Sequence, residues 1–354
     1  MQINRYIIRL CCGEKLKAAL LYGPGDFRIE EIPKHHVEGD EVLIRVKACG
    51  VCPGDLRPYL GIKSLWPPKY PLLLGHEVAG VVEEVGESVK WVNVGDRVAV
   101  DMIIRCGKCH YCLIGKDNLC ERRGAFIGGF AEYTKAPERN VFKIPSSLSF
   151  EEATLAEPLA CCINSIEKLD VHYGDNVVII GAGPLGLLHL QLLKLKGANV
   201  IVSEILDERL KVAEKLGADA LINPSEVDAE AKVKELTEGR GADGVVVAVG
   251  NKKAIEQGIR MAGKLARVVL FGAIWPPTEI SLDPNLLHYK EIILTGVHGR
   301  TLKQFYTAVK LLSTKKVIVK PLITHVYPLE SIREAFEAAA RRLGLKVVVK
   351  VAED

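Results

Sequence analysis

The sequence lacks the features that mark a membrane protein or a nucleic-acid-binding protein. Its 354 residues contain no apolar segment near the ~20 residues that a membrane-spanning helix needs. The net charge is only +3, and no dense block of lysine or arginine appears. We therefore expect neither nucleic acid nor an anionic membrane as a partner.

The first residues also lack the marks of a secretory signal. The apolar centre of residues 1–16 is short and interrupted by Arg9, and no A-x-A-like cleavage site follows it. Because Lys17 opens a strand-like run, residues 1–16 are interpreted as an extension outside the core or as the result of a mis-assigned start. Without a secretory signal, the reducing cytoplasm is the expected location.

Length and pattern predict two domains of different kinds. A chain of this size is too long for one ordinary core. Up to residue 164 the sequence shows short strand-like runs broken by glycine and proline, which indicate a β-rich domain. Over residues 165–300 strands and helices alternate, which predicts an α/β domain with a doubly wound parallel sheet. Residues 301–354 are expected to return to the first domain.

A glycine cluster in the second domain carries the chemistry of dinucleotide binding. Glycines at 181, 183 and 186 match the G-x-G-x-x-G pattern between a Val/Ile run at 177–180 and a leucine-rich helix. The first glycine permits a tight turn, the second lets a pyrophosphate approach the backbone, and the third lets the helix pack on the strand. The helix amino terminus then faces the phosphates.

An acidic residue at the end of the next strand favours NAD. Glu204 lies about 20 residues past the glycines, where a carboxylate accepts hydrogen bonds from the adenosine ribose and repels a 2′-phosphate. Arg209 leaves room for NADP, unless it is an ordinary solvated helix residue. The expected cofactor-binding residues of this stretch are Gly181, Gly183, Pro184, Leu185, Gly186, Glu204 and Arg209.

Four of the ten cysteines have the spacing of a metal site. The pattern C-x2-C-x2-C-x7-C can close a tetrahedron around one Zn²⁺ and leaves no position for a substrate. An iron–sulfur cluster is the alternative, because spacing alone does not fix the metal. The expected structural zinc ligands are Cys106, Cys109, Cys112 and Cys120.

Taken in chain order, these motifs resemble those of the zinc-dependent medium-chain alcohol dehydrogenase family. The resemblance runs from Lys17 onward and includes GVCPGD at 50–55, GHEVAG at 75–80 and AEPLA at 156–160. It is nearest to the sorbitol (polyol) and L-threonine dehydrogenase branch because of Glu157. It implies a GroES-like catalytic domain, a Rossmann domain and a second, catalytic zinc.

The resemblance also implies the residues of the catalytic site. Cys52 and His76 match the first two zinc ligands, and Glu77 and Glu157 match carboxylates that bind or exchange at the metal. Asp55 fits a partner that orients a ligand. One thiolate, one imidazole and one or two carboxylates leave a place for water or an alcohol. Singly, His76 could be a structural histidine and Glu77 a strand-edge charge. The family also implies cofactor contacts from Phe271, Gly272, Val297 and His298.

Two positions depart from the family pattern. Where the family carries a hydroxyl and a histidine that pass the substrate proton to solvent, this chain has Gly54 and Arg57. Glycine has no group that transfers a proton, and arginine stays protonated. The proton is therefore expected to leave through water at the metal, through Glu157 or through the nicotinamide ribose.

The resulting hypothesis is an enzyme of class 1.1.1 that oxidises a polyol or sugar-like secondary alcohol with NAD. L-threonine and simple secondary alcohols are the alternative substrates. A non-catalytic zinc and NAD-binding redox sensor is the alternative of another class, and a zinc-free reductase is a further one. The family implies a homotetramer, or else a dimer.

Overall fold

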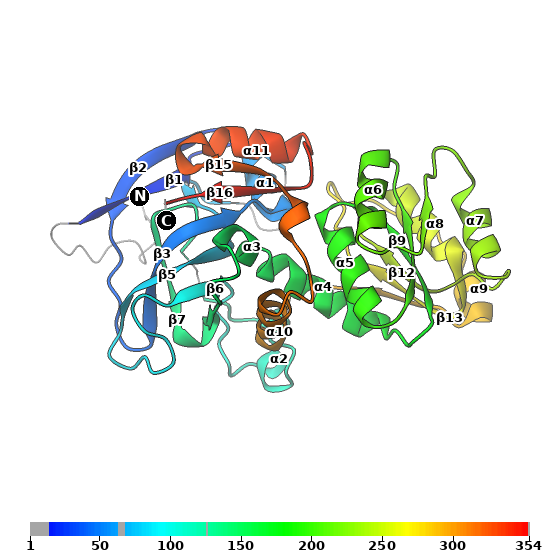
Figure 1. The fold of residues 1–354 in the computed structure, drawn as a ribbon, viewed down its shortest axis with the longest axis horizontal. Helices are drawn as coiled ribbons and strands as arrows, with labels where there is room; N and C mark the ends of the chain where they lie inside the picture. The colour runs from blue at the N-terminus through cyan, green and yellow to red at the C-terminus, as the bar shows by residue number, and fades with distance from the viewer. Residues whose placement is uncertain (1–13, 63–67, 125–126, 353–354) are drawn as a thin grey trace. The chain divides into compact units, whose positions relative to one another are not determined.

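The computed structural model describes residues 14–62, 68–124 and 127–352 (Figure 1). The chain divides into two compact units. Unit 1 comprises Met1–Glu157, Phe305–Lys315 and Ile323–Asp354, and unit 2 comprises Pro158–Gln304 and Lys316–Leu322. The domain boundaries after residues 164 and 300 remain predictions.

Unit 1 is built on two antiparallel-rich sheets. The smaller sheet has the order β2-β1-β4, and the larger has the order β15-β16-β3-β5-β6-β8, with β7 pairing β3. Eight of the ten residues of β3 and five of the nine residues of β5 are buried, so both faces of β3 are covered. The strands are β1 (Lys15–Leu21), β2 (Phe27–Pro33), β3 (Glu41–Gly50), β4 (Leu72–Leu73), β5 (Glu77–Val85), β6 (Arg97–Asp101), β7 (Tyr133–Pro137), β8 (Val141–Lys143), β15 (Ile323–Pro328) and β16 (Lys346–Lys350).

Helices connect these strands, and two of them contain residues of both units. The helices of this part are α1 (Pro53–Tyr59), α2 (His110–Leu113), α3 (Phe150–Thr154), α4 (Ala156–Leu169), α10 (Leu302–Ser313) and α11 (Ile332–Ala340). Single 3-10 turns lie at Asp117–Leu119, Glu138–Asn140, Lys320–Leu322 and Leu329–Ser331. No helix in the described part of the chain is long and apolar enough to cross a membrane.

The predicted extension, residues 1–16, wrongly includes the first two residues of the first strand. β1 begins at Lys15 rather than at Lys17, and Leu16 pairs with Ile32 of β2. Leu16 is buried at 1% exposure beside Ala18 and Ala131, so burial of an apolar side chain extends the strand. Residues 1–13 lie outside the described part.

Unit 2 is a doubly wound parallel sheet, which confirms the predicted fold class. The strand order is β11-β10-β9-β12-β13-β14, and every neighbouring pair is parallel. The strands are β9 (Asn176–Ile180), β10 (Asn199–Ser203), β11 (Ala220–Ile222), β12 (Ala242–Val247), β13 (Ala262–Leu270) and β14 (Ile293–Gly296). The order reverses at β9, which is the switch point where such sheets bind ligands.

Helices cover both faces of this sheet. In Figure 1, α5 and α6 lie on one side of the strands, and α7 and α8 lie on the other. The helices are α5 (Pro184–Leu195), α6 (Asp207–Lys215), α7 (Ala229–Leu236), α8 (Lys252–Met261) and α9 (Pro284–Lys290). The sequence pattern did not predict α9, which is short and begins at a local cap where Asp283 accepts a hydrogen bond from the Asn285 amide.

Candidate active site

Three potential metal ligands of unit 1 lie together at strand ends. Cys52 follows β3 and caps the amino terminus of α1, while His76 and Glu77 stand at the start of β5. One ligand atom from each of these side chains lies within 4.8 Å of the others. Because β3 and β5 are neighbours, with Gly50 paired to Glu77, the sheet register brings the two motifs together.

A buried carboxylate fixes the two ligand loops relative to each other. Asp55 is 3% exposed and accepts hydrogen bonds from the Cys52 amide at 3.2 Å and the Gly75 amide at 3.4 Å. Its Oδ1 also lies 3.2 Å from His76 Nδ1. A histidine held through Nδ1 presents Nε2 to a metal, so Asp55 has the geometry of the ligand-orienting partner proposed for it.

Protons compete with a metal ion for the two ligands Cys52 and His76. Burial raises the pKa of Cys52, although the neighbouring His76 opposes the shift, so a cation is needed to keep the sulfur as a thiolate. Burial lowers the pKa of His76, but Asp55 and Cys52 raise it by more, and the ring pKa lies well above its ordinary value. A metal ion must therefore displace a proton to bind.

Glu157 is buried near these groups but stands outside the close cluster. It occupies the first turn of α4 at 6% exposure. Its charge contributes to the pKa shifts of Cys52 and Lys346, which places the carboxylate within electrostatic range of both. The group of ligand atoms within 4.8 Å of one another does not include it. Direct ligation by Glu157 remains a prediction.

Sequence reasoning missed Lys346, which forms an ion pair with Glu77. Its Nζ lies 2.7 Å from Oε1 and 2.5 Å from Oε2 of Glu77, and both side chains are almost fully buried. Burial lowers the pKa of Lys346, but Glu77, Cys52 and Glu157 together raise it by more, so its pKa lies above its ordinary value. The one available signal was a lysine opening the otherwise apolar run of β16.

The donor set fits zinc in an open site. A sulfur, an imidazole nitrogen and carboxylate oxygen are ligands that Zn²⁺ accepts, and fewer than four protein ligands leave a position for an exogenous oxygen. Cys52 and His76 are only partly buried, so the cluster is accessible from solvent.

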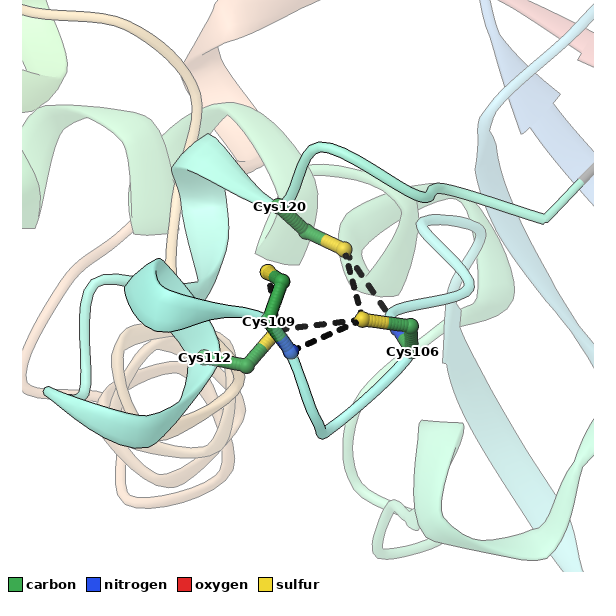
Figure 2. A group of neighbouring side chains, drawn as sticks. All are labelled: Cys106, Cys109, Cys112 and Cys120. Atoms are coloured by element: carbon green, nitrogen blue, oxygen red, sulfur yellow. Dashed lines mark hydrogen bonds between the residues drawn. The ribbon is translucent and has the colours of Figure 1, made fainter.

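The four predicted structural ligands also converge. Figure 2 shows Cys106, Cys109, Cys112 and Cys120 with their sulfurs grouped, and all four ligand atoms lie within 4.8 Å of one another. The nearest sulfur pairs are 3.5 Å apart for Cys120 and Cys106 and 3.6 Å apart for Cys109 and Cys112, and none of the four is in a disulfide.

Backbone amides prepare this cluster for a cation. The amides of Lys108 and Cys109 donate to Cys106 Sγ and lower the pKa of that thiol to about 6. Burial and hydrogen bonds from neighbouring thiols raise the pKa of Cys112 to about 12. The loop thus stabilises one thiolate in advance, and a bound metal would supply the charge that the others need. Four sulfurs fill a tetrahedral site, which suits a structural zinc.

The glycine-rich loop of unit 2 leaves space where a phosphate would lie. Gly183 caps α5, and a Cβ placed on it would meet nothing nearer than Arg209 Nη1 at 4.0 Å. A Cβ on Gly186 would instead overlap the carbonyl oxygen of Gly181, so this glycine is needed for close packing of helix and strand. Pro184 and Leu185 form the first turn of α5. This cradle fits a dinucleotide pyrophosphate.

Glu204 links the loop to the end of β10. One carboxylate oxygen accepts from the Ala182 amide at 2.8 Å, and the other accepts from the Ile205 amide at 2.8 Å and the Leu206 amide at 3.2 Å. The side chain is 7% exposed, so these bonds fix its position. The Glu204 carboxylate can still accept a hydrogen bond from a ribose hydroxyl, because only three amides donate to it.

The other expected cofactor residues lie at the same edge of the sheet. Phe271 and Gly272 directly follow β13, and Val297 and His298 directly follow β14. Because the strands are parallel, these residues lie at their carboxyl ends, as the glycine loop does after β9. Asn164 Nδ2 donates to the His298 and Gly299 carbonyls at 3.3 and 2.9 Å, which supports the loop after β14.

Comparison with known proteins gives consistent matches across the chain. Residues 38–146 match the alcohol dehydrogenase GroES-like domain, and residues 184–314 match the zinc-binding dehydrogenase domain. A sorbitol dehydrogenase of Halalkalibacterium halodurans is 36% identical over 338 residues, which cover 93% of this chain and 96% of that protein. An L-threonine 3-dehydrogenase of Pyrococcus abyssi is 41% identical over 308 residues, which cover 84% and 87%.

A solved structure extends the likeness to the fold. The crystal structure of 2R,3R-butanediol dehydrogenase from Bacillus subtilis matches with a TM-score of 0.87 and 32% identity. The match covers 95% of this chain and all of that one.

Two glycines of the cofactor loop are expected to respond differently to the same substitution. Gly186→Ala forces a methyl group into the Gly181 carbonyl and should destabilise the protein by about 1–3 kcal/mol in chemical denaturation. Gly183→Ala has room in the free protein, so its unfolding should be unchanged. It should nevertheless weaken NADH binding, measured by fluorescence titration, by about tenfold or ~1.4 kcal/mol. Equal stability of the two variants would contradict the packing role of Gly186.

Proposed function

We propose that this chain, which belongs to the zinc-dependent medium-chain alcohol dehydrogenase family, oxidises a secondary alcohol of a polyol or sugar-like substrate with NAD⁺. The chain is an NAD(P)-dependent oxidoreductase that acts on CH–OH groups. The choice of a polyol is supported by the sorbitol dehydrogenase relative and by the butanediol dehydrogenase of similar structure. L-threonine is the second candidate, because the L-threonine 3-dehydrogenase of Pyrococcus abyssi is 41% identical.

The observation that carries the proposal is the incomplete ligand set of Cys52, His76 and Glu77. Closed four-sulfur sites stabilise folds, whereas a site with fewer protein ligands can accept a substrate oxygen. Zinc bound there supplies a Lewis acid that lowers the pKa of the substrate hydroxyl, and NAD⁺ supplies the hydride acceptor.

The residues of the chain hold this chemistry in place. Asp55 fixes the ring of His76 and the amide of Cys52, so the two ligands keep their separation. Glu204 and the glycine loop hold the adenosine and pyrophosphate parts of the cofactor. We assign Glu77 and Glu157 as the carboxylates that surround the metal.

The cofactor assignment is NAD and two zinc ions per chain. The matched family is described as zinc-binding, and solved structures of similar fold hold NADP or NADH. The preference for NAD is supported by Glu204, whose charge would repel the 2′-phosphate of NADP. One zinc is assigned to the open set and one to the four cysteines.

We also propose a homotetramer located in the cytoplasm. The proposal is supported by exposed apolar side chains next to the cysteine cluster, where Leu113 and Ile114 are 74% and 55% exposed. A third exposed apolar residue, Ile293 at 46%, lies on β14 at the edge of the six-stranded sheet. Contiguous apolar patches and the unpaired backbone groups of an edge strand are both features of surfaces that bind another chain.

A substrate panel tests the function. Purified protein should reduce NAD⁺ with polyols such as sorbitol and butanediol, faster than with L-threonine or simple secondary alcohols, and faster than it reduces NADP⁺. Metal analysis of the same preparation should give two zinc ions per chain. Preferred turnover of L-threonine would transfer the proposal to the second candidate. Two zinc ions and bound NAD without any turnover would support the redox sensor instead.

Gly54 generates a second test of the mechanism. A Cβ at this position would lie 3.6 Å from both Cys52 Sγ and His76 Cε1, which are ordinary contacts, so a serine fits beside the metal ligands. Gly54→Ser should raise kcat for a simple secondary alcohol at neutral pH by about tenfold, below the ~10²–10⁴ of a tuned acid–base group. Gly54→Ala is the matched control and should leave kcat unchanged. An equal rise in both variants would refute a role for the hydroxyl.

The assembly is tested by the mass of the protein in solution. Analytical ultracentrifugation should give four chains per particle, because apolar surfaces at the cysteine lobe and at β14 provide two separate interfaces. Leu113→Glu should reduce the particle to a dimer, whereas Tyr173→Glu, at a similarly exposed position elsewhere, should not. A monomeric native protein would overturn the proposal.

A further inference from the structure

A buried histidine stands in the helix that follows the glycine-rich loop. His189 lies on α5, one turn after Leu185, and its side chain is completely buried. Its Nδ1 lies 2.7 Å from the Leu185 carbonyl oxygen. Burial lowers the pKa of His189 to about 4, so the ring is neutral at neutral pH. Because a carbonyl oxygen only accepts hydrogen bonds, Nδ1 carries the proton, and this bond fixes the ring against the first turn of the helix.

A second helix contacts the same carbonyl group. Cys162 on α4 is fully buried, and its Sγ donates to the Leu185 carbonyl oxygen at 3.6 Å. The Leu185 carbonyl therefore accepts from one buried side chain on each helix. A rotation of the His189 ring would break the stronger of these two bonds, because a thiol is a weak donor.

The fixed imidazole packs against an aromatic ring of the next layer. The ring centroids of His189 and Phe271 are 4.6 Å apart, and their planes meet at 83°, which is the favoured edge-to-face arrangement. Phe271 directly follows β13, and its amide donates to the Val247 carbonyl at 3.1 Å. The end of β12 thus holds the backbone of Phe271, and His189 holds its ring. Phe271 remains partly exposed, so some of its surface is available to a ligand.

The strand order relates Phe271 to one half of a dinucleotide. Glu204 follows β10 and the glycine loop follows β9, and these two strands are neighbours at one side of the switch point. The order continues from β9 to β12 and β13. A dinucleotide with its adenosine at Glu204 and its pyrophosphate at the glycine loop extends its nicotinamide half toward β12 and β13. Phe271 stands at the end of the second of these strands.

Packing alone does not explain an imidazole at position 189. Within the residues that the structure describes, the buried Nε2 of His189 has no hydrogen-bond partner. A buried acceptor without a partner lowers stability. The neighbouring Leu188 and Leu190 are also fully buried and carry no polar atom. A leucine of similar volume would serve the core better, and side chains that break such a local rule are expected at functional sites.

We propose that His189 is a positioning residue that fixes the ring of Phe271 for the nicotinamide half of the cofactor. The inference rests on the proposed function for the identity of that cofactor. Because His189 is completely buried, it acts through Phe271 and not by direct contact with the cofactor.

A leucine at position 189 tests the inference. His189→Leu removes the edge-to-face contact and also the unpartnered Nε2, so the midpoint of thermal unfolding should be unchanged or higher. The dissociation constant of NADH in calorimetric titration should rise about fivefold, as expected for the loss of one aromatic pair. Binding of ADP-ribose, which lacks the nicotinamide ring, should not change. An unchanged constant for NADH, or an equal rise for both ligands, would overturn the inference.

The matched control is a second buried polar residue of the same helix. Gln191 is 8% exposed, its Nε2 donates to the Ile318 carbonyl at 3.0 Å, and its Oε1 accepts from the Ile318 amide at 2.7 Å. Gln191→Leu leaves both groups of Ile318 unpaired and should lower the midpoint of unfolding. The ratio of the NADH and ADP-ribose dissociation constants should stay at the wild-type value. A changed ratio would mean that any damage to α5 produces the effect, which contradicts the inference.

A double variant tests the route through Phe271. Phe271→Leu removes the partner ring and should weaken NADH binding by itself. In that background, His189→Leu should cause no further change in the dissociation constant of NADH. A second loss of about fivefold would show that His189 acts independently of Phe271, contrary to the inference.

A milder variant applies if His189→Leu does not fold. In His189→Asn the amide nitrogen can take the place of Nδ1 at the Leu185 carbonyl, but no ring remains to contact Phe271. This variant should show the same selective loss of NADH binding. Wild-type affinity for NADH in His189→Asn would contradict the inference.

Fluorine NMR of the free protein separates this inference from the proposed function. If the wild-type protein binds neither NADH nor ADP-ribose, the proposed function fails, whereas the position of the Phe271 ring can still be measured. With para-fluorophenylalanine in place of Phe271, the protein with His189 should give one fluorine signal. His189→Leu should broaden or split that signal, because the ring samples several positions. One sharp signal in both proteins would show that His189 does not position the ring.

Discussion

The carboxylate of Asp55 is the constraint on which the geometry of the metal site depends. It joins the Cys52 amide, the Gly75 amide and the ring of His76, which belong to two loops about twenty residues apart in the sequence. Loops that carry metal ligands have few restraints of their own. A buried acceptor shared by both loops holds the sulfur and the imidazole at a fixed separation before any metal binds. The conformational entropy of the two ligand loops is therefore lost during folding and not when the metal binds.

Each unit presents its chemistry at the ends of strands. In unit 1 the ligands follow β3 and precede β5, and in unit 2 the glycine loop, Glu204 and Phe271 follow β9, β10 and β13. Strand interiors are fixed by burial, with the valines and isoleucines at 177–179 fully buried. The backbone one or two residues beyond such a strand is held in a fixed position by the strand, and its side chains can contact a ligand. A rigid sheet can therefore position a site that is made from loop residues at its strand ends.

Features set by local pattern could be predicted from the sequence. The Val/Ile runs at regular intervals predicted the parallel sheet, and the spacing of the four cysteines predicted a cluster that the structure brings together. Both signals need only neighbouring residues. The Lys346–Glu77 pair could not be found in this way, because its partners are 269 residues apart and meet only through strand pairing. β2 was also missed, since its sequence FRIEEIP has exposed charges and obtains its structure from pairing with β1.

The charges around the open metal set explain why a lysine is buried there. Asp55, Glu77, Glu157 and the thiolate of Cys52 would surround a divalent cation with more negative charge than it neutralises. In a site of low dielectric constant, this excess would oppose a substrate oxygen that develops negative charge during oxidation. The ammonium of Lys346 reduces the excess from within the sheet, 2.7 Å from Glu77 Oε1, without occupying a position on the solvent side of the site. The buried lysine thus offsets part of the carboxylate charge around the open metal set.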